Sequence, residues 1–145
     1  MRAVSPADHA EWLRLRAALW PEDDESEHRR QMTIILSDAA QAVFVADAGG
    51  RRVGFVEASI HPHAIGCASN PVGYVEGWYV DPALRRRGIG RRLLAAAEAW
   101  AASRGCVEMA SDARATNDVS RAAHHAAGYS ETAVLVHFRR RITPV

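Results

Sequence analysis

The chain has 145 residues, the size of one domain, and 48% of them are hydrophobic and 24% charged, which is ordinary for a soluble globular protein. The formal net charge of +1 argues against a nucleic-acid-binding protein that depends on broad phosphate neutralisation. Two cysteines exclude a disulfide framework, and no apolar run reaches the ~18–20 residues that span a bilayer, so we expect a cytoplasmic protein without signal peptide or membrane anchor.

The N-terminal third predicts a short strand and two helices. Met1–Val4 is the strand candidate. Apolar residues at helical spacing predict an amphipathic helix over Asp8–Leu19, which ends before Pro21 because proline disfavours helix at the preceding residue. A second helix is expected over Glu25–Leu36.

The middle of the chain predicts three strands. Ala42–Ala46 and Arg52–Ile60 flank a Gly-Gly turn, which is a hairpin signal. His61–Pro71 is polar and interrupted by glycine and proline, so we expect a loop, and Val72–Val80 is the next strand.

The last third predicts alternating helices and strands, namely a helix over Gly90–Arg104, a strand over Val107–Ser111, a helix over Asn117–Ala127 and a final long strand over Tyr129–Arg140. Strands joined by a hairpin pair antiparallel, and strands joined by a helix pair parallel. The expected fold is therefore a single α/β domain with a mixed sheet.

The most informative segment is a basic, glycine-bearing junction between the Val72–Val80 strand and the following helix. Gly88 and Gly90 allow close backbone approach, and N–H groups at a helix start bind anions such as pyrophosphate. The dinucleotide fingerprint is absent, because Leu93 occupies its third glycine position, and no Walker motif is present. A solvated basic turn is the alternative interpretation.

The pattern Arg85-x-x-Gly88-x-Gly90 after Tyr79-Val80-Asp81-Pro82 resembles the acetyl-CoA loop of the GNAT N-acetyltransferases. The resemblance implies a GNAT-like mixed, mostly antiparallel sheet with a parallel splayed pair of strands, flanked by helices. It further implies that the strand before the loop ends in a bulge, that its backbone pairs with pantetheine, and that an N–H there polarises the thioester. The implied cofactor-binding residues are Trp78, Tyr79, Val80, Arg85, Arg86, Arg87, Gly88, Ile89, Gly90, Arg91 and Asn117.

Finer motifs resemble the aminoglycoside 6′-N-acetyltransferases within that family. They are Leu19-Trp20-Pro21, Val75-Glu-Gly-Trp-Tyr-Val80 and Gly105-Cys-Val-Glu-Met-Ala-Ser-Asp112. The resemblance implies acetylation of a 6′-amino group, antibiotic resistance and a homodimer. Aminoglycosides carry several positive charges, and carboxylates bind such groups through charge-assisted hydrogen bonds.

The implied acceptor site has a proton acceptor and three residues that bind the substrate. Glu76 would take the proton from the amine, Asp112 would hold the amine, and Trp20 and His63 would contact the drug. Each has a structural alternative: Trp20 as a core residue, Asp112 as a turn former, and the acidic run Glu22–Glu25 as a solvated helix start rather than a rim of the site.

The transfer is expected to be direct, because neither Cys67 nor Cys106 has a sequence partner that marks an activated nucleophile. His124 stands where the superfamily often has a tyrosine that protonates the departing thiolate, so His124 is a candidate acid or a packing residue. Neither His61-x-His63 nor His124-His125 has Cys or Asp partners at zinc-site spacing, so no metal is expected.

Two other functions remain open at this stage, namely acetylation of another amine (a polyamine or a protein N-terminus) and a non-catalytic acetyl-CoA-binding module. The long apolar edge of Thr132–Arg140 favours dimerisation.

Overall fold

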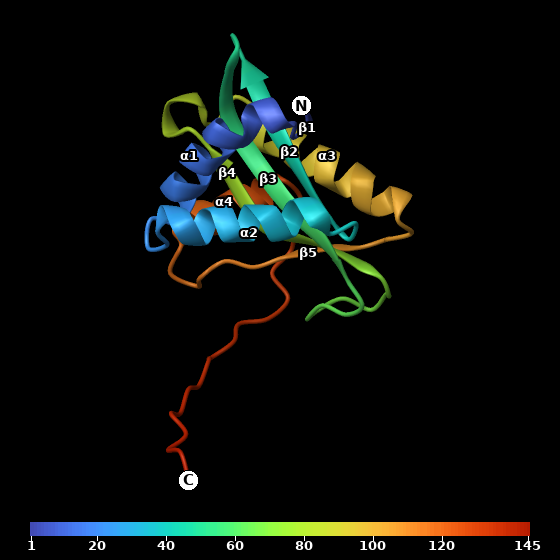
Figure 1. Ribbon diagram of the computed structural model, residues 1–145. Helices are drawn as coiled ribbons and strands as arrows, with labels where there is room; N and C mark the ends of the chain where they lie inside the picture. The colour runs from blue at the N-terminus through green and yellow to red at the C-terminus, as the bar shows by residue number, and fades with distance from the viewer. The chain divides into compact units, whose positions relative to one another are not determined.

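The computed structural model describes all residues, Met1–Val145, and divides into two compact units, Met1–Asp112 and Ala113–Val145. The first unit contains a five-stranded sheet in the order β1-β2-β3-β4-β5 (Figure 1). All neighbours are antiparallel except β4 and β5, which run parallel, so the expected mixed sheet is confirmed. The elements of this unit are β1 (Arg2–Ala3), η1 (Pro6–Asp8), α1 (His9–Leu19), α2 (Glu25–Ser37), β2 (Gln41–Ala48), β3 (Arg51–His61), β4 (Val72–Val80), η2 (Pro82–Leu84), α3 (Ile89–Ser103) and β5 (Met109–Ser111).

Helices cover both faces of the sheet (Figure 1). Successive side chains of a strand point to opposite faces. Phe55 of β3 meets the Trp20 ring at the end of α1, whereas a Cβ on its neighbour Gly54 would lie 3.2 Å from Leu93 of α3. The helices α1 and α2 therefore lie on one face and α3 on the other. The core under α1 and α2 consists of Trp12, Leu15, Met32, Val43, Val45 and Phe55.

One extra residue interrupts the pairing of β4 with β3. Gly77 is opposite Glu57 and Val75 is opposite Ala58, so Glu76 has no partner and forms a β-bulge. A bulge shifts the alternation of the side chains by one. As a result, Glu76 and Gly77 both face the α1 side, where a regular strand would turn one of them toward α3.

The parallel strands β4 and β5 separate early. They pair only over Gly73–Val75 and Met109–Ser111, so the edge of β4 that faces away from β3 has no strand neighbour from the bulge to Val80. The expected strand over Val107–Ser111 is shorter in the structure. The splayed parallel pair is confirmed.

The second unit contains one helix, α4 (Asp118–Ala126), which Gly128 follows with a φ of +92°. The strand expected over Tyr129–Arg140 is absent, and residues 129–145 form no helix or strand. An alternating apolar pattern becomes a strand only when a neighbour accepts its backbone hydrogen bonds. Phe138 and Ile142 in this segment are 93% and 87% exposed.

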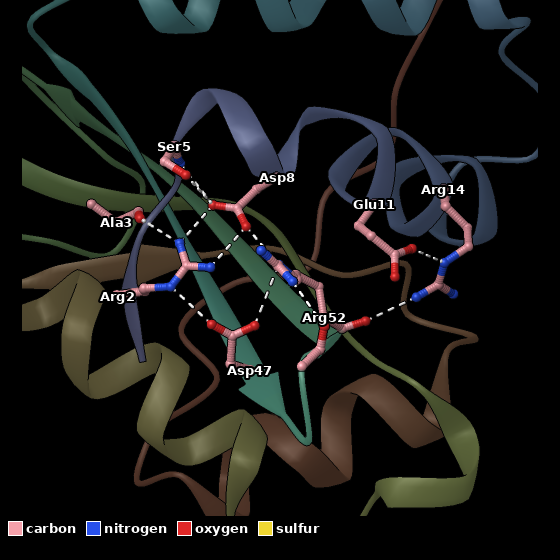
Figure 2. Close-up of polar contacts among 9 residues, drawn as sticks. Arg2, Ala3, Ser5, Asp8, Glu11, Arg14, Asp47 and Arg52 are labelled. Atoms are coloured by element: carbon pink, nitrogen blue, oxygen red, sulfur yellow. Dashed lines mark hydrogen bonds and ion pairs between the residues drawn. The ribbon is translucent and has the colours of Figure 1, made fainter.

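A buried carboxylate fixes the N-terminus against the β2–β3 hairpin (Figure 2). Asp8 is fully buried and accepts from Arg2 Nη1 at 2.6 Å, Arg52 Nε at 2.6 Å and the Ser5 backbone N–H at 2.8 Å. The Arg2 guanidinium is the main reason that the pKa of Asp8 lies far below its ordinary value. Both arginines also contact Asp47, which extends the cluster to the hairpin.

Replacement Asp8→Asn is expected to lower the free energy of unfolding by about 2–3 kcal/mol near neutral pH, because it leaves two arginines without their shared carboxylate. A carboxyl with a depressed pKa in the folded state stabilises the fold above its unfolded pKa and ceases to do so as pH falls. Denaturant titrations from about pH 7 to about pH 3 should therefore show the wild-type and variant curves converging below about pH 4.

Asp47→Asn is the matched control, since Asp47 is 37% exposed and should cost less than about 1 kcal/mol. A difference between Asp8→Asn and wild type that stays constant across this pH range would contradict the prediction.

Candidate active site

A basic loop joins β4 to α3 and leads into the N-terminus of that 15-residue helix. Gly88 is the N-cap residue and has a φ of +81°. Arg86, which is not a glycine, has a φ of +63°, a left-handed conformation that costs free energy in a residue with a Cβ. The helix start presents backbone N–H groups and exposed arginines together, and this combination suits a pyrophosphate.

Two aromatic residues of β4 hold this loop. Trp78 Nε1 donates to the Gly90 carbonyl at 3.0 Å, and a Cβ on Gly90 would lie 3.0 Å from the Trp78 ring. Arg85 Nε donates to the Val80 carbonyl at 2.9 Å, while its guanidinium lies 5.4 Å from the centre of the Tyr79 ring. Arg85 therefore supports the loop itself, which leaves the exposed Arg86 and Arg87 as more direct candidates for the phosphates.

The backbone of β4 next to the loop has an edge without a strand neighbour, as pairing with pantetheine would require. The bulge lies at Glu76 and not at the end of the strand, so that expectation is wrong in position. Trp78, Tyr79 and Val80 pair regularly with β3 on their other edge.

Two carboxylates, a serine, a histidine and a tyrosine form a polar cluster on the α1 side of the sheet. Glu76 Oε1 lies 2.7 Å from His61 Nε2 and accepts from the Ser59 hydroxyl, and the Tyr74 hydroxyl donates to Asp112 Oδ2. The structure thus brings the predicted Glu76 and Asp112 to one cluster through His61 and Tyr74.

The two carboxylates differ in how they are held. Both hydrogen bonds to Glu76 reach Oε1, so Oε2 is open to accept a proton. Burial, followed by the hydrogen bond to Asp112, raises the pKa of Tyr74 well above its ordinary value. Tyr74 therefore stays protonated and donates to Asp112.

Trp20 lies directly beside the bulge. A Cβ on Gly77 would be only 2.4 Å from Trp20 Cη2, so only glycine fits under the indole ring. The Arg16 guanidinium lies 4.7 Å from the centre of the same ring. Trp20 is half-buried and packs on Phe55 and Gly77, the residue that follows Glu76.

A buried ion pair lies beneath this region. Arg16 Nη1 lies 2.5 Å from Glu57 Oε1, and Trp12 Nε1 donates to Glu57 Oε2 at 3.0 Å. Burial raises the pKa of Glu57, and the Arg16 guanidinium opposes that rise. His28 Nδ1 lies 3.3 Å from Arg16 Nε and its Nε2 lies 3.1 Å from the Trp20 carbonyl, so the ion pair connects α1, α2 and β3.

Other predicted residues lie outside the polar cluster. His63 is exposed in the loop after β3 and makes none of the contacts within the cluster. The acidic run forms a helix start, as its structural interpretation predicted, because the Asp24 carboxylate accepts from the Glu27 N–H at 2.8 Å. Burial is the main cause that raises the pKa of Cys67, which is the opposite of an activated nucleophile.

The second unit holds two predicted residues. Asn117 is the N-cap of α4, and its Oδ1 accepts from the Ser120 N–H at 3.0 Å. His124 Nδ1 lies 2.7 Å from the Ser120 carbonyl. A carbonyl only accepts, so Nδ1 carries a hydrogen, and His124 can donate from Nε2 only as an imidazolium.

Sequence reasoning missed Ser59, His61 and Tyr74. Their signal was the two-residue period of a strand, which places Ser59 with His61 and Tyr74 with Glu76 on shared faces. Recognising it requires the register of β3 and β4, including the bulge. No group of three or more His, Cys, Asp or Glu side chains is arranged to hold a metal ion.

Comparison with known protein families matches residues 9–129 to the acetyltransferase (GNAT) family. The chain belongs to the GNAT acetyltransferase family. It is 44% identical over 146 aligned residues to an aminoglycoside N(6′)-acetyltransferase type 1 of Stenotrophomonas maltophilia, covering 99% of this chain and 94% of the relative.

Solved GNAT structures agree with this assignment. The aminoglycoside 6′-N-acetyltransferase AAC(6′)-IG of Acinetobacter haemolyticus superimposes with a TM-score of 0.92 at 36% identity and covers 98% of both chains. AAC(6′)-Iy, solved with a bisubstrate analogue of CoA and acetylneamine, gives a TM-score of 0.92 at 37% identity over 97% of both chains. None of the helices in this GNAT chain is long and apolar enough to cross a bilayer.

Proposed function

We propose that this GNAT protein transfers the acetyl group of acetyl-CoA directly to the 6′-amino group of aminoglycoside antibiotics in a ternary complex, and so confers resistance. The observation that carries the proposal is the pair of carboxylates in the polar cluster, namely Glu76 on β4 and Asp112 after β5, which the Tyr74 hydroxyl links to β4. A polycationic acceptor needs carboxylates there, and a non-catalytic acetyl-CoA module does not. The names of the relatives support the same acceptor.

Acetyl-CoA fits the donor side. The exposed arginines and N–H groups at the start of α3 suit its pyrophosphate, and the open edge of β4 suits its pantetheine amides. We assign the contacts to Trp78, Tyr79 and Val80 through their backbones, to Asn117, and to the loop residues Arg85, Arg86, Arg87, Gly88, Ile89, Gly90 and Arg91.

On the acceptor side, the substrate ammonium first transfers one proton to Glu76 Oε2, which becomes a neutral carboxylic acid. The free amine, which Asp112 holds in line, then attacks the thioester carbonyl. Trp20 and His63 are assigned to the wall of the substrate site. A positioned base contributes roughly 10²- to 10⁴-fold to the rate.

The nitrogen of the tetrahedral intermediate carries one proton more than the amide product. As the intermediate collapses, this proton passes to solvent water and CoA leaves as a thiolate. We propose His124 as the acid that protonates it from Nε2, after which Nδ1 keeps its hydrogen bond to Ser120. We further propose a single cytoplasmic N-acetyltransferase domain over residues 1–145, without nucleic acid or membrane as partner.

A substrate panel tests the function. With acetyl-CoA, CoA release is expected with kanamycin and tobramycin, which carry a 6′-amine, and not with paromomycin, which has a 6′-hydroxyl. CoA release with polyamines but not with aminoglycosides would contradict the aminoglycoside assignment and indicate an acetyltransferase for another amine. No release with any amine would favour a binding module.

The variant Glu76→Gln tests the base. The amide keeps the size of the side chain but cannot take a proton, so kcat should fall roughly 10²- to 10⁴-fold at neutral pH. Measuring kcat across the pH range for Glu76→Gln and His124→Gln in parallel separates the role of base from the role of acid. The kcat of His124→Gln should fall less than that of Glu76→Gln. Activity of Glu76→Gln near that of wild type at every pH would exclude Glu76 as the base.

We also propose a homodimer, because exposed apolar side chains gather in the C-terminal segment, among them Val134, Val136 and Phe138. Light scattering should give twice the chain mass of 15.8 kDa. The double variant Val134→Asp/Val136→Asp should shift the mass to that of one chain. A wild-type mass of 15.8 kDa would contradict the dimer.

A further inference from the structure

Two aromatic rings on neighbouring strands form a stacked pair inside the polar cluster. The rings of His61 on β3 and Tyr74 on β4 are stacked with their centres 4.7 Å apart and an interplanar angle of 27°. Each ring directs its polar group to a different carboxylate, His61 to Glu76 and Tyr74 to Asp112. One rigid pair therefore holds both carboxylates of the proposed acceptor site.

The direction of the hydrogen bonds follows from the acceptors. An ionised carboxylate only accepts, so His61 Nε2 carries a hydrogen and donates to Glu76 Oε1. The same Nε2 lies 2.9 Å from the Ser59 hydroxyl oxygen, and the Ser59 hydroxyl donates to Oε1 as well. Two donors on Oε1 fix the plane of the carboxylate.

The side chains need this support because both are exposed. Glu76 and His61 are each 38% exposed, and a glutamate at that exposure samples several rotamers unless hydrogen bonds restrict it. Stacking restricts the His61 ring in turn, since Tyr74 is fixed at its hydroxyl by Asp112. The arrangement is a chain of four side chains with a carboxylate at each end.

We infer that His61 and Tyr74 are positioning residues for the acetyl transfer: His61 orients Glu76 for proton removal, and Tyr74 orients Asp112 for binding of the cationic substrate. This inference rests on the proposed function. It predicts that loss of the His61 contact changes kcat and that loss of the Tyr74 contact changes KM. If the stacked pair had only a structural role, both substitutions would have the same effect.

Two phenylalanine variants test the inference, because each keeps a ring in the stack. His61→Phe removes the contacts of Nε2 with Glu76 and Ser59, and Tyr74→Phe removes the hydrogen bond to Asp112. His61→Phe should lower kcat roughly 10- to 100-fold, the range for a misplaced reacting group, with KM for the aminoglycoside within about threefold of wild type. Tyr74→Phe should raise that KM roughly 5- to 50-fold and leave kcat within about threefold. KM for acetyl-CoA should stay unchanged in both.

A third variant separates orientation from folding. The amide N–H of His61→Gln can donate to Glu76, so this variant should recover at least about fivefold in kcat over His61→Phe. The matched control His9→Phe changes a histidine at the start of α1, outside the cluster, and should keep wild-type kcat and KM. Circular dichroism and thermal unfolding establish the folded fraction of each variant.

The inference fails if His61→Phe keeps kcat within twofold of wild type, if His61→Gln is no better than His61→Phe, or if the two phenylalanine variants change kcat and KM alike. Glu76→Gln distinguishes these failures from failure of the proposed function. An inactive Glu76→Gln beside an active His61→Phe overturns only the positioning role, whereas an active Glu76→Gln overturns the base itself.

Discussion

The bulge at Glu76 is the constraint on which the candidate acceptor site depends. One additional residue in β4 brings Glu76 and Gly77 to the same side of the sheet. Glu76 thereby reaches Ser59 and His61, and Gly77 leaves space for the Trp20 ring. Without the extra residue the alternation of β4 would turn either the carboxylate or the space for the indole toward α3. Bulges are a common means of re-aiming a side chain at a functional site.

The ion pair of Arg16 and Glu57 supports this arrangement from below. Glu57 is opposite Gly77 in the sheet, and Arg16 contacts both Glu57 and the Trp20 ring. A buried ion pair contributes little net stability when its desolvation is counted, but removing one partner is strongly destabilising. Here the ion pair restricts how the elements can pack, because the two charges stay paired only when α1, α2 and β3 have this relative arrangement. The Trp20 ring and Gly77, the residue next to Glu76, therefore rest on the same buried contacts.

Much of the first unit could be predicted from the sequence because its signals are local. Val72–Val80 was predicted with both ends correct, and the glycines around 88 and 105 marked the limits of α3. Glu76 and Asp112 were predicted from motifs, whereas His61 and Tyr74 depend on strand register, which a sequence pattern does not contain. The strand expected over Tyr129–Arg140 is absent for a related reason. Its alternating apolar pattern is typical of a strand, but the pattern does not contain a neighbouring strand to pair with.

At Arg86 the loop has a side chain that suits an anionic ligand on a backbone conformation that suits glycine. A glycine would adopt the φ of +63° without steric penalty, as Gly88 does at +81° two residues later. The loop instead keeps a long cationic side chain at a position where the backbone disfavours it. At position 86, glycine would favour thermal stability, whereas arginine would favour the proposed binding of acetyl-CoA. A glycine chosen at position 86 for its backbone alone would therefore relieve the scaffold and remove a cation that we propose for the pyrophosphate of the cosubstrate.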